Sequence, residues 1–255
     1  MRISFSKSVT ESLLAKIRSG EMMSRNEKFN LIIQLSIPSI LAQVTTVLMF
    51  YIDAGMVGSL GAEPSAAIGL VEPATWLFFS LVSAVTMGFS VQVAHFIGAN
   101  DFAKARAVMR HGYIFGLCFA LFLLLITFLI GSRLPVWLGG GTDIQHDATV
   151  YFLIFSLIIP FHLIEYMSAA MLKVSGDMRR PSFMAILMCV LDVIFNYFFI
   201  FPTRTVSLFG VEVTMPGLGE GVAGAALGSL LSFVCVALPL AYYAIFRSPI
   251  LAWKQ

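Results

Sequence analysis

The chain has 255 residues, of which 58% are hydrophobic and only 12% are charged, with a formal net charge of +2. A soluble domain carries roughly 25% charged residues, so much of this surface must face lipid. The small net charge gives no reason to expect a nucleic acid partner. Composition therefore predicts a polytopic membrane protein.

The first 28 residues are charged and lack a continuous apolar stretch, so we do not expect a cleavable signal peptide. Val9, Leu13, Leu14 and Ile17 share one helical face. This spacing predicts an amphipathic helix on the cytoplasmic membrane surface. A solvated leader is the alternative.

Six apolar runs are long enough to cross a bilayer, which needs about 20 helical residues. They cover residues 30–58, 66–97, 111–131, 147–172, 181–201 and 219–246. The runs are too long for membrane β-strands and do not alternate, so we expect an all-α membrane protein with six transmembrane helices. The chain then divides into a cytoplasmic leader at 1–28, a six-span lobe at 29–246 and a cytoplasmic tail or inter-lobe connection at 247–255.

The basic residues predict the orientation. Fourteen of the 16 Lys and Arg residues lie in the leader, the tail and the loops after the second and fourth spans. The other three loops hold only Arg133 and Arg204. Because cytoplasmic loops are enriched in Lys and Arg, both termini are expected in the cytoplasm. The loops near 59–65, 132–146 and 202–218 are expected outside.

Several polar residues fall inside the outer half of the predicted spans, where each acid is a candidate functional group. At about 1.5 Å per residue, Asp53 lies roughly 8 Å, Glu72 about 9 Å and Asp192 about 14 Å from the outer ends of their spans. Asn196 is four residues from Asp192, so both point the same way from one helix. Ser229 reaches about 15 Å in the sixth span. These five groups can therefore share one layer.

Such a layer is a candidate cation-coupling site. Carboxylate, amide and hydroxyl oxygens are the ligands of hard cations, so Asp53, Asp192, Asn196 and Ser229 could hold Na⁺, with Glu72 as an accessory. The same carboxylates could instead carry a proton. The alternative is that these groups only form hydrogen bonds between helices.

Other polar residues fit structural roles better. Glu165 lies near the cytoplasmic end of the fourth span, where we expect an ion pair with Lys173 or with the Arg179–Arg180 pair, or snorkelling. His162 is one turn away.

No histidine has metal-ligand spacing with another, so no metal is expected beyond a possible Na⁺. No catalytic or phosphate-binding motif occurs, so we expect neither enzyme activity nor a cofactor.

Prolines and a run of small residues occur within the spans. Pro38, Pro73, Pro160 and Pro239 lie inside them, where proline kinks a helix, either as a fixed packing feature or as a hinge. The run GVAGAALGS at 221–229 predicts that the sixth span approaches a neighbouring helix closely.

Seven segments between residues 28 and 246 stand in a fixed order. They are LSIPSILAQ at 35–43, YIDAGMVGSLG at 51–61, AAIGL at 66–70, GFSVQVAHFIGANDFAKA at 88–105, GDMRRP at 176–181, LDVIFNYFFIF at 191–201 and GEGVAGAALGS at 219–229. In this order and spacing they resemble the multidrug and toxic compound extrusion (MATE) family. The resemblance implies twelve helices in two six-helix lobes, of which this chain would be the amino-terminal one.

The resemblance also implies export of bulky, often cationic compounds in exchange for Na⁺ or H⁺. Asp53 matches the first-span acid of the family's cation site, and Asp192 and Asn196 match its fifth-span pair. The family often has Asn at the first position of that pair and Asp or Asn at the second. Asp192 departs from this pattern, because it keeps an acid on the same helix face but one turn away. Ser229 matches a position where Thr is common.

The implied partners are small organic substrates, membrane lipid and a second six-helix lobe, with no nucleic acid. Because the chain stops after six spans, the expectation is a partial sequence, with a half-transporter that pairs with another copy as the alternative. The expected location is a plasma membrane, the inner membrane of a bacterium. Competing functions are a lipid-linked-precursor flippase, a lipid-modifying membrane enzyme using His162 and Glu165, and a non-transporting subunit.

Overall fold

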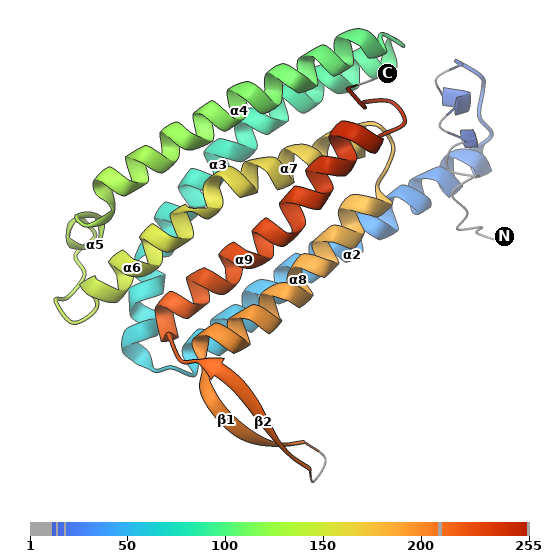
Figure 1. Cartoon of the computed structure of the whole chain (residues 1–255). Helices are drawn as coiled ribbons and strands as arrows, with labels where there is room; N and C mark the ends of the chain where they lie inside the picture. Colours follow the sequence, from blue (N-terminus) through green and yellow to red (C-terminus); the bar gives the residue numbers. More distant parts are fainter. Residues whose placement is uncertain (1–11, 14, 18, 209–210, 254–255) are drawn as a thin grey trace.

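The computed structural model describes residues 12–13, 15–17, 19–208 and 211–253. Long helices lie side by side in one bundle (Figure 1). They are α2 (Arg25–Gly58), α3 (Ala62–Gly98), α4 (Phe102–Gly131), α6 (Gln145–Ser156), α7 (Ile158–Val174), α8 (Arg179–Ile200) and α9 (Gly221–Tyr242). Five are long and apolar enough to span a membrane, and the bent pair α6–α7 gives a sixth candidate span. The predicted six-span all-α class is therefore confirmed.

Helix α2 begins at a capping box that was not predicted. The Ser24 side chain accepts a hydrogen bond from Glu27 N (3.2 Å), and Glu27 Oε2 accepts one from Ser24 N (2.9 Å). These bonds satisfy two backbone donors that a helix start leaves free. In the leader, residues 12–13 and 15–17 are helical, with Leu13 buried and Ile17 exposed. Val9 and Leu14 lie outside the described residues, so the amphipathic helix stays a prediction.

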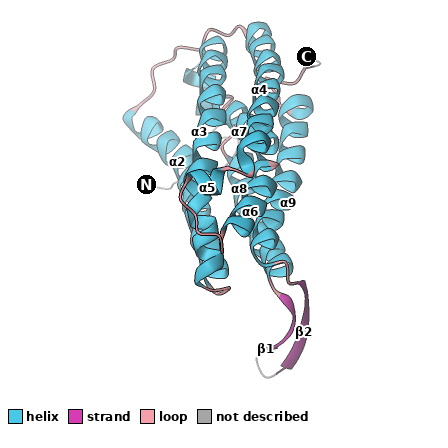
Figure 2. Ribbon diagram, turned by 90° about the vertical axis from the view of Figure 1, so that its left-hand side faces the viewer, coloured by secondary structure: helices cyan, strands magenta, loops and turns pink. Residues whose placement is uncertain are grey.

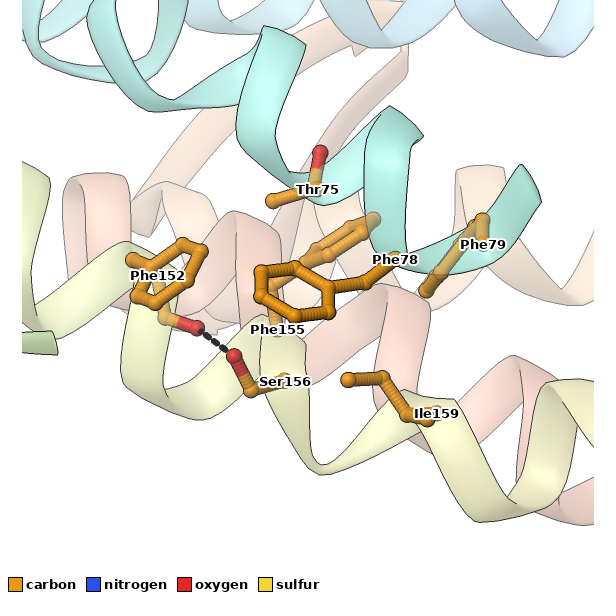
Figure 3. Close-up of a pocket in the computed structure, with 7 residues that line it drawn as sticks. All are labelled: Thr75, Phe78, Phe79, Phe152, Phe155, Ser156 and Ile159. Carbon is orange, nitrogen blue, oxygen red and sulfur yellow. Dashed lines mark hydrogen bonds between the residues drawn. The ribbon is translucent and has the colours of Figure 1, made fainter. Parts of the chain in front are cut away.

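The fourth span is bent by 40° between α6 and α7. Pro160 has no N–H and crowds the carbonyl of Ser156, four residues earlier, so the regular ladder stops there. Leu157 N instead bonds to Ile154 O (3.1 Å), and Ser156 Oγ donates to Phe152 O (2.6 Å). Aromatic rings of α3 and α6 surround a small hollow at this break (Figure 3). Of the four prolines, Pro160 thus lies beside an observed bend.

Two loops at one end of the bundle contain structure that was not predicted. Segment 202–218, expected as an outer loop, forms an antiparallel hairpin of β1 (Pro202–Leu208) and β2 (Val211–Leu218) with Val206 opposite Val213. The hairpin projects beyond the helix ends (Figure 2). A short helix, α5 (Leu134–Trp137), lies in the loop before α6. The basic-rich loops after α3 and α7 lie at the opposite end (Figure 1).

The core lies mainly between α3, α4, α7 and α9, whereas α2 packs along α8 and keeps much of its surface exposed. Helix α9 continues into a π-helical turn, η1 (Tyr243–Arg247), one turn after Pro239. Helices α2, α8 and α9 are therefore neighbours, and this arrangement brings the predicted polar residues together.

Candidate cation site

Two glycines of α9 permit the close contact of this helix with α8. A Cβ atom at Gly224 would lie 2.6 Å from the carbonyl carbon of Phe199. A Cβ atom at Gly228 would lie 2.8 Å from Asn196 N and would also clash with Asn196 Oδ1. No side chain fits in this space, so the small-residue run 221–229 packs as the sequence predicts. The contact presses Asn196 against α9.

Asn196 joins two helices through its side-chain amide. Its Nδ2 donates to Asp53 Oδ1 on α2 (2.9 Å) and to Asp192 Oδ2 on α8 (3.0 Å). Asp192 and Asn196 are fully buried, and Asp53 is half-buried. The predicted meeting of Asp53 with the fifth-span pair is therefore present in the structure.

Helix α9 completes this cluster with hydroxyl groups. Ser232 Oγ lies 3.1 Å from Asp192 Oδ1 and 2.8 Å from Ser229 O, so its single proton has two possible acceptors. The Ser229 side chain also neighbours the Asp192 carboxylate. Ser232 was absent from the sequence-based set, although it lies three residues after Ser229 and so on the same helix face. We call Asp53, Asp192, Asn196, Ser229 and Ser232 the polar cluster.

The charge balance of the polar cluster favours a positively charged guest. Within the described part of the chain, neither Asp53 nor Asp192 forms an ion pair with a Lys, Arg or His. One neutral amide bridges the two carboxylates, and it cannot cancel their charge. Asn196 Oδ1 is buried without a hydrogen-bond partner and packs against Gly228, while the NH2 group of the same amide faces the two carboxylates. A sodium ion or a proton would reduce the negative charge of the two carboxylates.

Glu72 lies outside the polar cluster. It is exposed on α3, and its Oε1 accepts a hydrogen bond from Trp76 Nε1 (3.3 Å). The depth predicted for Glu72 is compatible with the cluster, but its side chain is exposed and bonds to Trp76 on its own helix.

The prediction for Glu165 needs correction. Among the described residues it forms no ion pair within 4.0 Å, since Lys173 is eight residues away, about 12 Å along the helix. Arg180 instead pairs with Asp177 and stacks over Tyr243 at 4.0 Å. His162 stacks on Phe79 with ring centroids 4.4 Å apart, and both its ring nitrogens are buried without a hydrogen-bond partner.

Comparison with known proteins agrees with the arrangement of helices. The family model described as MatE matches residues 38–198, more than half of the chain. The chain belongs to the MatE family. It is 25% identical over 215 residues to a protein named "Probable multidrug resistance protein NorM" from Neisseria meningitidis, covering 83% of this chain and 44% of that protein. The "Multidrug export protein MepA" of Staphylococcus saprophyticus is 21% identical over 228 residues, covering 89% of this chain and 47% of that protein.

Solved MATE structures share the fold of this chain. A crystal structure of MATE in complex with MaD3S superposes with a TM-score of 0.77 at 25% identity, covering 88% of this chain and 47% of that one. An outward-facing multidrug resistance MATE transporter gives a TM-score of 0.77 at 23% identity, covering 97% of this chain and 49% of that one. The chain spans about half the length of the relatives it matches. These relatives are named as transport or resistance proteins, in agreement with the expectation that the chain is not an enzyme.

Proposed function

We propose that this chain forms one six-helix lobe of a cation-coupled antiporter that exports bulky, often cationic organic compounds. The observation that carries the proposal is the Asn196 amide, which bridges the carboxylates of Asp53 and Asp192 across two helices. The names of its relatives, which are multidrug resistance and export proteins, support the class of substrate.

The polar cluster can couple an ion to the position of α2. Asp53 and Asp192 would hold Na⁺, with Asn196 Oδ1 as a further ligand once its amide turns over, or the two carboxylates would share a proton, and either guest lowers the negative charge of the pair. Helix α2 packs mainly along α8, so the Asp53–Asn196 contact is a principal polar link between α2 and the rest of the lobe. Without the guest, repulsion between the two carboxylates favours separation of the helices. An ion that binds one arrangement more tightly shifts the lobe toward it.

A second lobe would complete the transporter. The proposal is supported by the length of the matched relatives, about twice that of this chain. The second lobe is either a carboxyl-terminal half or another copy of this chain, in a bacterial inner membrane with both termini of this lobe in the cytoplasm. We expect the chain expressed alone to give no drug efflux, because one lobe cannot enclose a two-sided cavity. Efflux by the chain alone, purified as a stable dimer, would support the half-transporter instead.

Ion binding tests the polar cluster in the chain as it is. We expect calorimetric titration of the purified chain with NaCl, in buffer at pH 8 and against a choline chloride control, to give saturable binding. Asp53→Asn should remove this heat. Asp143→Asn is the matched control, since Asp143 is exposed in the loop before α6. Saturable sodium binding by the Asp53→Asn protein equal to that of wild type would exclude Asp53 as a ligand. If sodium gives no heat with wild type, uptake of a proton on acidification of the same samples tests the alternative ion.

A further inference from the structure

A carboxylate and two aromatic rings lie together on the exposed surface of α2 and α3. Trp76 is 47% exposed, and its indole N–H donates to the carboxylate of Glu72, which is itself exposed. Phe50 of α2 is 41% exposed, with its ring centroid 5.1 Å from that of Trp76 and the two rings inclined by 50°. This aromatic–carboxylate patch is separate from the polar cluster.

The patch lies at membrane depth but has no counter-charge. Glu72 is ten residues into α3, about 15 Å along the helix, so it is level with the hydrocarbon of a bilayer. No Lys, Arg or His of the described chain pairs with it. Because an ionised side chain facing lipid is costly, this surface must border water or a ligand. Space is open beside it, since a Cβ atom at Gly69, one turn away, would meet nothing within 4 Å.

We propose that Phe50, Glu72 and Trp76 form a recognition site for an organic cation, such as a quaternary ammonium or a planar aromatic cation. Faces of aromatic rings attract cations, and the carboxylate supplies the opposite charge. The indole N–H holds this carboxylate beside the rings. The patch lacks the several oxygen ligands that a sodium ion needs, whereas the polar cluster offers them. The inference rests on the proposed function in one respect, because it takes the bound cation to be the exported substrate.

The position of the patch relative to the polar cluster suits exchange of two cations. Phe50 of the patch lies three residues before Asp53 on α2, about one helical turn away, so the two sites adjoin along this helix. Positive charges in both sites would repel across the low-dielectric interior. Occupation of one site therefore weakens binding at the other, as an antiporter requires.

The test measures binding of ethidium, a planar aromatic cation, to the purified full chain in detergent by fluorescence anisotropy. Glu72→Gln is expected to weaken binding about tenfold or more, and Trp76→Leu by a similar factor, because each removes one attractive element. Glu63→Gln is the matched control, since Glu63 is also exposed on α3 and is also followed by proline. Trp137→Leu is the control for an exposed tryptophan. Both controls should bind ethidium as wild type does.

A sodium titration of the same proteins separates this inference from the proposed function. Weaker ethidium binding by Glu72→Gln, with sodium binding unchanged, supports the patch and shows that the variant is folded. Equal ethidium affinity in wild type, Glu72→Gln and Trp76→Leu overturns the patch, while loss of sodium binding in Asp53→Asn would leave the proposed function standing. Absence of ethidium binding to wild type also overturns the patch as a site within this chain.

Discussion

Replacing Gly228 by alanine tests the helix contact that positions the polar cluster. The added Cβ would lie 2.8 Å from Asn196 N and 3.0 Å from Asn196 Cα, closer than side-chain carbons pack against backbone. Both neighbours are backbone atoms, so α8 and α9 must move apart. Overpacking of this kind costs about 1–3 kcal/mol. The movement also displaces Asn196 from its 2.9 Å bond to Asp53.

The assay for Gly228→Ala combines thermal unfolding in detergent with the sodium titration. We expect a lower melting temperature and a loss of sodium affinity together. Gly88→Ala is the matched control, because Gly88 is exposed within α3 and a Cβ there meets nothing within 4 Å. Alanine at this position should stabilise the helix by about 0.5–1 kcal/mol. If Gly228→Ala melts and binds sodium as Gly88→Ala does, the close α8–α9 contact is not what places Asn196.

Three further results are expected. Ser232→Ala removes the hydroxyl that lies 3.1 Å from Asp192 Oδ1 and should weaken sodium binding by about 1 kcal/mol by titration, whereas an unchanged affinity would exclude the hydroxyl from the site. Asp101 caps α4, and hydrogen bonds from Lys104 hold the pKa of its carboxyl below the usual range. The ionised carboxylate therefore stabilises the folded chain fully above pH ~4, and this stabilisation is lost as pH falls through the lowered pKa. The melting-temperature difference between wild type and Asp101→Ala should therefore shrink on acidification from pH 7 to pH 3, and a constant difference would contradict the linkage. Finally, in intact cells an impermeant thiol reagent should label Gly140→Cys but not Ala103→Cys, both in a background with the native cysteines replaced, and the reverse pattern would overturn the proposed orientation.

The spans could be predicted because long apolar runs have few other uses, and the meeting of Asp192 with Asn196 followed from their spacing of four residues. Distance along a helix gives depth but not direction around the neighbouring helices. Glu72 therefore has a depth compatible with the polar cluster, and yet its side chain is exposed and bonds to Trp76. For Glu165 the spacing was itself informative, since eight residues place Lys173 too far away for a pair.

The hairpin and Ser232 were missed for different reasons. Residues 203–208 and 211–215 alternate in part between polar and apolar types, a strand signal that a short connection between two spans obscures. Ser232 looked like an ordinary hydroxyl in a small-residue helix. Only the close approach of α9 to α8 brings its oxygen to Asp192. Such contacts depend on helix rotation and packing, which a hydrophobic pattern does not specify.

The most direct test of the central claim is drug efflux driven by an imposed ion gradient. The complete transporter, consisting of this lobe and its partner lobe, would be reconstituted in vesicles with a sodium or a proton gradient. We predict that Asp53→Asn abolishes ion-driven efflux while the protein still inserts into the membrane. Asp192→Asn should reduce efflux less, since Asp53 and Asn196 remain. Efflux by the Asp53→Asn transporter at the wild-type rate under both gradients would contradict the account.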